Sequence, residues 1–293
     1  MPTTPAAPPD QEIPDHQIHG AMTIDVEEYF HVSAFEGIID RADWPQYESR
    51  VAASMAEMLD LFAETGRKGT FFVLGVVARD HPAIVRRLAA EGHEIASHGW
   101  EHRRVFHETR AEFRDEVART KALLEDIGGQ HVAGYRAPSF SITAATPWAY
   151  EVLGETGHRY SSSSNPITGN RYGCPEEPLT PYTVEGAGIV EIPITTLPFR
   201  GRRVAGGGGG YFRLLPPMVF RRAARHAAAE GVPPNFYLHP WEIDPGQPRI
   251  GGTRPAAGFR HYVGLSRTKR RLRRHLSTFA WDRMDHVYRD WLS

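Results

Sequence analysis

Short strand-like runs alternate with helical patterns over the first half of this chain. The strand-like runs cover residues 21–25, 69–74, 93–97 and 132–136. Between and after them, apolar residues and end signals indicate helices over residues 51–64, 83–91, 108–127 and 147–154. Such an alternation predicts a parallel sheet covered by helices. We therefore expect an α/β fold.

Groups that could do chemistry follow several of these strand-like runs. Asp25, His98 and Arg136 stand at or after three of them, and His239 follows a later apolar run. A (β/α) barrel gathers its catalytic groups from scattered sequence positions at the carboxyl-terminal ends of its strands. The pattern therefore predicts a barrel-like fold with one site at that face.

The segments around His98 and Asp25 carry the densest chemistry. His98 and His102 are four residues apart, one turn of helix, so both could project from one face. Asp25, Glu27 and Glu28 bring carboxylates at the end of the first strand-like run. Two histidines and one carboxylate with open coordination positions form a minimal catalytic metal site. A second carboxylate beside it could act as general base.

Bulk composition excludes some classes of function. A net charge of −1 over 293 residues lacks the basic surplus of a nucleic-acid-binding protein. The single Cys174 excludes an internal disulfide and a CxxC zinc site. Residues 1–20 lack the basic and apolar regions of a secretory signal, and no window is apolar enough to span a bilayer. The expected location is cytoplasmic, with association to a membrane surface left open.

Taken in order, these motifs resemble the polysaccharide deacetylase (NodB homology) family, carbohydrate esterase family 4. More narrowly, Asp-Val-Glu-Glu-Tyr-Phe at 25–30 and Gly-Tyr-Phe-Arg-Leu-Leu-Pro at 210–216 look like its branch linked to exosortase-type exopolysaccharide clusters. The resemblance implies a distorted (β/α) barrel of the NodB type with a C-terminal helical and loop extension. It divides the chain into a flexible tail (1–18), a deacetylase domain (19–248) and the extension (249–293).

The resemblance also implies roles for individual residues. His98 and His102 match the family's metal-binding histidines, and Asp25 matches its general base. Arg136 matches the arginine that keeps this aspartate ionised, as a contacting cation would. His239 matches the histidine that acts as general acid.

A turn after the arginine is expected to stabilise the oxyanion. The backbone amide of Ser139 matches the family's oxyanion donor, and Pro138 and Phe140 flank it on the substrate side. Glu191 lies where the fourth family motif is expected and is a weak candidate for orienting a histidine.

The chain departs from the family pattern at the first metal motif. Val26 stands where the family has a second aspartate as metal ligand, so the carboxylate has moved to Glu27 or Glu28. Side chains alternate along an extended segment, so Glu27 shares the face of Asp25 and is the expected third ligand. Glu28 stays the alternative if the strand ends earlier. Gly99 replaces the usual Ser or Thr after the first histidine.

The expected reaction is metal-dependent removal of N-linked acetyl groups from an N-acetylated oligo- or polysaccharide, or its precursor. The expected cofactor is one divalent metal ion. Zinc is the first choice, and cobalt, nickel, manganese and iron are alternatives. Two other functions remain open on the same motifs. One is a small-molecule amidohydrolase acting on a cyclic amide or imide, and the other is a catalytically silent carbohydrate-binding module.

Two further segments have more than one interpretation. Residues 206–210 are five consecutive glycines, which predicts either a flexible surface loop or a loop that approaches a substrate closely. Residues 268–275 carry Lys269 and four arginines. These basic residues indicate either a solvated helix face, which is the simpler interpretation, or a surface that contacts an anionic membrane or substrate.

Overall fold

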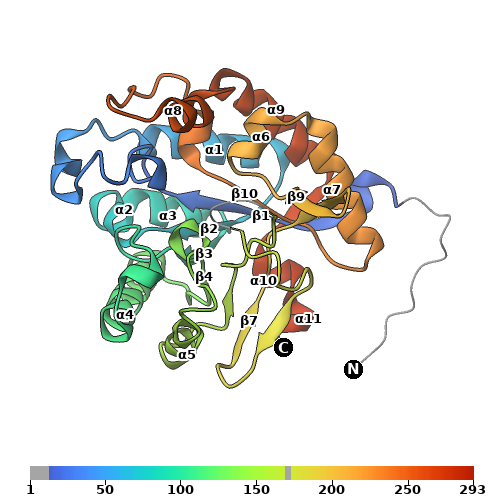
Figure 1. The fold of residues 1–293 in the computed structure, drawn as a ribbon, viewed down its shortest axis with the longest axis horizontal. Coiled ribbons are helices and arrows are strands. Elements are labelled where there is room, and N and C mark those ends of the chain that lie inside the picture. Colours follow the sequence, from blue (N-terminus) through green and yellow to red (C-terminus); the bar gives the residue numbers. More distant parts are fainter. Residues whose placement is uncertain (1–12, 169–172) are drawn as a thin grey trace.

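A curled, mostly parallel sheet organises the computed structural model, which describes residues 13–168 and 173–293. In this part of the chain the sheet has nine strands in the order β10-β1-β2-β3-β4-β5-β7-β6, with β11 pairing to β1. Within this nine-stranded sheet, all described pairs are parallel except β6 with β7, which is antiparallel. Figure 1 shows helices around the outside of the curled sheet, from α1 and α9 to α4 and α5.

The strands are short, and their ends define the edge that carries the site. In chain order they are β1 (His19–Val26), β2 (Thr70–Val73), β3 (Glu94–Ser97), β4 (Gly134–Tyr135), β5 (Tyr160–Ser161), β6 (Tyr182–Val184), β7 (Ile189–Glu191), β8 (Thr196–Phe199), β9 (Arg202–Ala205), β10 (Asn235–Leu238) and β11 (Ala280–Asp282). Strands β8 and β9 form a separate two-stranded ribbon.

Helices lie on both sides of the sheet. They are α1 (Val51–Thr65), α2 (Gly75–Asp80), α3 (Pro82–Ala90), α4 (Arg110–Gly128), α5 (Trp148–Glu155), α6 (Gly210–Leu214), α7 (Pro217–Ala229), α8 (Pro255–Tyr262), α9 (Leu265–Thr278), α10 (Met284–Val287) and α11 (Arg289–Leu292). None of the helices described is long and apolar enough to cross a bilayer.

Strand β1 is buried on both faces, because helices cover one side and the sheet curls around the other. Its side chains Met22, Ile24 and Val26 pack into the main apolar core beneath α1 and α9. Ala21 packs with Phe72 in a smaller cluster on the other side. Burial of this kind stabilises by roughly 25 cal/mol per Å² of apolar surface. The strand is therefore a rigid support for the residues that follow it.

The expected α/β fold is confirmed as a half-barrel whose sheet remains open. All eight strand and helix segments predicted over residues 21–154 are present within a few residues. Gly129 ends α4 in the left-handed conformation (φ 62°), as the Gly128-Gly129 pair predicts. Helix α2 was not predicted, because six residues are too few to establish a helical period.

The glycine run takes up neither of the two roles expected of it. Gly206 to Gly209 are buried, and Gly207 and Gly209 exchange backbone hydrogen bonds with Tyr237 of β10. A Cβ on Gly208 would lie 2.1 Å from the carbonyl oxygen of Tyr237. The close approach that requires glycine is therefore to the chain's own strand, and only Gly210 reaches the site cavity.

The N-terminal tail prediction is wrong for its last residues. Residues 1–12 lie outside the described part of the chain. Beyond them, Ile18 is buried and the Asp15 carboxylate accepts a 2.6 Å hydrogen bond from Arg225 of α7. This segment therefore packs against the folded body. The boundary at residue 248 stays a prediction.

Candidate active site

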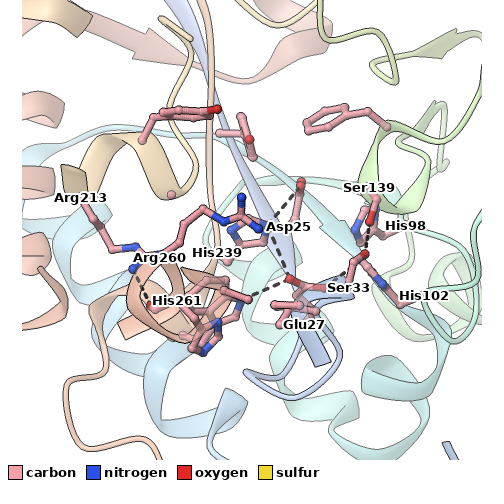
Figure 2. A pocket seen from close by; sticks show the side chains of 18 of the residues that line it. Asp25, Glu27, Ser33, His98, His102, Ser139, Arg213, His239, Arg260 and His261 are labelled. Carbon is pink, nitrogen blue, oxygen red and sulfur yellow. Dashed lines mark hydrogen bonds and ion pairs between the residues drawn. The ribbon is translucent and has the colours of Figure 1, made fainter. Parts of the chain in front are cut away.

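One cavity of about 170 Å³ is lined by most of the predicted functional residues. Because neighbouring strands are parallel, Asp25 on β1, His98 after β3 and His239 after β10 meet at the same edge of the sheet. Figure 2 shows their side chains around a common space, with Arg213 and Arg260 entering from the C-terminal part of the chain. The site forms at the face that the sequence predicted.

Glu27, His98 and His102 form a buried group of metal-ligand character. Their possible ligand atoms all lie within 4.8 Å of one another. His98 Nδ1 is 2.8 Å from the carbonyl oxygen of Arg136, which it reaches as a donor. This contact leaves Nε2 of His98 unprotonated and free, the arrangement usual for a histidine ligand.

Electrostatics make this group suited to a cation. Burial lowers the pKa of His98 to about 4 and raises that of Glu27 to about 7. Glu27 Oε2 is fully buried, 3.1 Å from Nε2 of His102, and no described residue donates a hydrogen bond to it. A divalent cation would satisfy this oxygen and both neutral imidazoles. The residues present therefore fit a metal.

Glu28 points away from this group. Its carboxylate accepts hydrogen bonds from the backbone N–H groups of Arg50 and Val51 at 3.0 and 3.1 Å, and from Ser49 Oγ at 2.5 Å. It therefore caps the start of α1, where the backbone donors lack helical partners. Of the two carboxylates left open by the sequence, only Glu27 lies beside the histidines.

The two histidines are not on a helix, contrary to the one-turn interpretation of their spacing. Residues 98–104 form a loop, in which His102 has φ 54° and Gly99 has φ 77°. The carboxylate of Glu116 on α4 accepts a 2.9 Å hydrogen bond from the Trp100 N–H, and its Oε1 would lie 2.6 Å from a Cβ on Gly99. A carboxylate from α4 thus supports this loop where the family pattern has Ser or Thr.

Asp25 is held as a carboxylate by Arg136. The guanidinium donates a 2.7 Å hydrogen bond to Asp25 Oδ1 and others to Thr23 and Ser162. Arg136 is completely buried and lies 4.1 Å from the ring centre of Phe72, which fixes its plane. Burial alone would raise the pKa of Asp25, but the charge and hydrogen bond of Arg136, together with the charges of His98 and His239, outweigh it and lower the pKa.

His239 is held as a cation by carboxylates. Its Nδ1 is 2.7 Å from Glu242 Oε1, and its Nε2 is 3.9 Å from Asp25 and 3.5 Å from Glu27. Burial would lower the pKa of His239, but the hydrogen bond to Glu242 and the nearby carboxylates raise it to about 9. Arg213 donates a 2.6 Å hydrogen bond to Glu242. Burial would raise the pKa of this carboxyl group, but Arg213 and His239 together lower it to about 2.

Ser139 lies in the turn predicted to hold the oxyanion donor. It has φ 56° in the short turn Pro138–Phe140, its hydroxyl contacts that of Ser33, and it lines the cavity beside Phe140. Pro138, which precedes it in the turn, is buried. Positive φ is costly for residues other than glycine and is retained where surrounding contacts hold it, often at functional sites.

Glu191 has no contact with a histidine of the site. It is completely buried at the end of β7, where it accepts 2.7 Å hydrogen bonds from the N–H groups of Ser163 and Ser164. The prediction that Glu191 orients a histidine of the site is therefore wrong. Glu242 has that position instead.

Sequence reasoning missed Glu242, Arg213 and Trp241. Trp241 donates a 3.1 Å hydrogen bond from Nε1 to Glu27 Oε1, and its ring stacks on His239. The signal for two of them was present, since His239, Trp241 and Glu242 lie in one four-residue stretch. Arg213 could not be found this way, because 29 residues separate it from Glu242.

Two family models match parts of the chain. Residues 44–159 match the model described as polysaccharide deacetylase, and residues 162–289 match a domain of unknown function, DUF3473. A chitooligosaccharide deacetylase of Sinorhizobium fredii is 48% identical over 46 residues, 16% of this chain and 21% of that protein. A peptidoglycan-N-acetylglucosamine deacetylase of Bacillus cereus is 33% identical over 82 residues, 28% of this chain and 30% of that protein.

Solved structures show the same fold over the whole chain. A candidate polysaccharide deacetylase from Mycobacterium smegmatis has a TM-score of 0.61 at 22% identity, covering 100% of this chain and 96% of its own. The PuuE allantoinase has a TM-score of 0.58 at 16% identity, covering 94% and 90%. Identities this low establish the fold alone.

The curled half-barrel with its site at the carboxyl-terminal edge defines an α/β protein of the NodB type. The chain carries, over residues 44–159, a domain of the polysaccharide deacetylase family. It spans less than a third of the length of the two curated relatives named above.

Proposed function

We propose that the protein is a metal-dependent hydrolase that removes N-linked acetyl groups from an N-acetylated oligo- or polysaccharide. The observation that carries this proposal is the group of Glu27, His98 and His102 beside Asp25 and His239 in one cavity. It supplies a cation site, a base and an acid within reach of one substrate. The family of the domain and the names of the relatives support the same reaction.

Each residue around the cavity has a distinct part in this hydrolysis. A divalent cation held by Glu27, His98 and His102 would polarise the acetamide carbonyl and lower the pKa of a bound water. Asp25, ionised beside Arg136, takes a proton from the attacking water. The Ser139 N–H donates to the oxyanion that develops at the former carbonyl oxygen.

Proton delivery to the leaving group completes the reaction. His239 donates its Nε2 proton to the departing amine as the C–N bond breaks. The water supplies the hydroxyl of the acetate product, and the sugar keeps a free amino group. The high pKa of His239 keeps this proton in place at neutral pH.

Zinc is the metal we propose first. Two histidines and one glutamate are a common catalytic zinc ligand set, with the remaining positions open. For the substrate we propose an N-acetylated polymer of exopolysaccharide biosynthesis. The cavity wall includes Tyr211, Leu214 and Arg260 from the C-terminal half, which gives an extended chain side chains to contact.

Acetate release tests the proposal directly. The protein, loaded with Zn²⁺, is incubated with an N-acetylglucosamine tetramer, and the acetate and free amine formed are measured. We expect the two products in equal amounts. The His98→Ala variant, which should not retain zinc, is the control. A cyclic imide is tested in parallel, because hydrolysis of that compound without acetate release would identify a small-molecule amidohydrolase. Zinc and oligosaccharide binding without any turnover would indicate a silent binding module.

A further inference from the structure

A second concavity, of about 460 Å³, lies between α7 and α9 on the C-terminal half of the molecule. Figure 1 shows α6, α7 and α9 close together on the same side of the sheet. Five arginines line this groove, and all five come from these two helices: Arg221, Arg267, Arg270, Arg271 and Arg274. We call it the arginine groove.

The basic residues of α9 divide into two faces with different partners. Lys269 pairs with Glu57 at 2.8 Å, and Arg273 pairs with Glu64 at 2.9 Å, so both are neutralised by α1. On the groove side, Arg221 of α7 pairs with Asp15, whereas Arg270 and Arg274 of α9 pair with no carboxylate among residues 13–168 and 173–293. The α9 side of the groove therefore carries positive charge that no described carboxylate compensates.

Like charges are also stacked along the groove. Arg267 and Arg271 are four residues apart, and so are Arg270 and Arg274, a spacing at which equal charges repel on a helix. Arg271 is turned inward and donates to the carbonyl oxygens of Phe212 and Arg213 at 2.7 and 3.2 Å. Burial, and then the charge of Arg267, lowers its pKa. A bound anion would relieve this repulsion.

An exposed apolar side chain lies beside the arginines. Met218, in the first turn of α7, is 76% exposed and lines the groove together with Pro217. Guanidinium groups bind phosphate through paired hydrogen bonds. Arginines next to exposed apolar side chains are typical of surfaces that bind the interface of an anionic membrane.

We propose that the arginine groove binds the phosphate headgroups of anionic lipids and docks the protein on a membrane surface. Helix α6 separates the groove from the catalytic cavity: Phe212 faces the groove, whereas Tyr211 and Leu214 line the cavity. Docking would therefore hold the cavity close to the bilayer. If the proposed deacetylation is correct, a saccharide attached to the same membrane would be presented to it.

Vesicle sedimentation tests the docking separately from catalysis. The full chain is mixed with vesicles of phosphatidylcholine alone, or with vesicles that also contain about 30 mol% phosphatidylglycerol. The phosphatidylglycerol gives the vesicle surface a negative potential, which attracts basic side chains. We expect sedimentation with the anionic vesicles only, and its loss at about 0.5 M salt, where charges are screened within about 4 Å. Equal sedimentation with both vesicles, or with neither, would overturn the proposal.

A matched pair of variants locates the binding face. Arg270→Gln/Arg274→Gln and Lys269→Gln/Arg273→Gln each remove two positive charges, four residues apart, from the same helix. We expect the first to weaken vesicle binding about tenfold or more and the second by less than about threefold, because only the first pair faces the groove. Equal losses would mean unspecific attraction and would refute the groove. Melting curves check that both variants fold.

Free phosphate is distinguished from lipid in a further arm. Inorganic diphosphate is titrated calorimetrically into the wild type and Arg270→Gln/Arg274→Gln. Diphosphate binding that depends on these arginines, without vesicle binding, would identify a soluble phosphate ligand and overturn membrane docking. Met218→Gln should weaken vesicle binding and leave diphosphate binding unchanged, because it removes only the apolar contact. Acetate release is measured apart, so failure of either proposal is recognised independently.

Discussion

Glu242 Oε1 lies 2.7 Å from Nδ1 of His239, and its other oxygen accepts a 2.6 Å hydrogen bond from Arg213. Glu242 is completely buried, so this contact orients the imidazole and stabilises its positive charge in a site shielded from water. Nε2 of His239 is thereby directed toward Asp25 and Glu27. Glu242, three residues after His239, therefore fixes the orientation and the charge of the proton donor in the proposed reaction.

Replacing Glu242 by Gln should move the alkaline limb of the rate profile to lower pH. The pKa of His239 is raised to about 9, so the proton needed for donation is present below that pH and is lost as pH rises through it. Without the carboxylate the pKa falls, and the proton is lost earlier. We expect kcat/KM at pH 8 to fall about tenfold to hundredfold, part of the 10²- to 10⁴-fold effect of a positioned proton donor.

Glu191→Gln is the control for this experiment. It neutralises another completely buried carboxylate, which contacts serine N–H groups and no site histidine. Its alkaline limb should coincide with that of the wild type, measured as kcat/KM from pH 6 to 10. An unchanged limb in Glu242→Gln would remove His239 as the titrating acid.

Glu27 and Glu28 should separate metal binding from stability. Glu27→Gln should lower zinc affinity at least tenfold, because Glu27 supplies the carboxylate of the buried group that it forms with His98 and His102. Glu28→Gln should keep wild-type zinc content but lower the free energy of unfolding by about 1 kcal/mol, because it weakens the cap of α1. Metal analysis after dialysis and denaturant unfolding measure the two effects. Loss of zinc in Glu28→Gln alone would reverse the ligand assignment.

Asp25→Asn should abolish turnover and leave the metal in place. The amide cannot take a proton from water, so we expect a loss of at least about 100-fold in kcat. His98→Ala, in contrast, should lose zinc and activity together, because His98 belongs to the ligand group and Asp25 does not. An Asp25→Asn variant with wild-type kcat would require another base.

Local sequence patterns predicted what depends on neighbouring residues and missed what depends on partners far along the chain. The strand before His98 and the carboxylates after β1 follow from periodicity and alternation, so Asp25, His98 and His239 were expected at one sheet edge. The conformation of the glycine run depends on Tyr237, about 30 residues later. The loop that carries the histidines depends on Glu116 of α4, so its spacing resembled a helical turn without being one. Cellular location stays a prediction.

Gly99→Ser, which restores the residue type usual in the family, should damage the site. Gly99 has φ 77°, and a Cβ there would lie 2.6 Å from Glu116 Oε1, the oxygen that accepts from the Trp100 N–H. The serine therefore either displaces Glu116 or shifts the loop between His98 and His102. We expect zinc binding to weaken about tenfold. The free energy of unfolding should fall by roughly 2 kcal/mol, of which about 1 kcal/mol comes from the left-handed backbone and the rest from crowding against Glu116.

Gly129→Ser separates crowding from backbone strain. Gly129 has φ 62°, close to that of Gly99, but nothing lies within 4 Å of its hypothetical Cβ. This variant should therefore lose about 1 kcal/mol from the left-handed backbone alone and bind zinc as the wild type does. Denaturant unfolding and zinc titration are compared for the two serine variants. If Gly99→Ser matched Gly129→Ser in both measurements, Glu116 would have no part in holding the histidine loop.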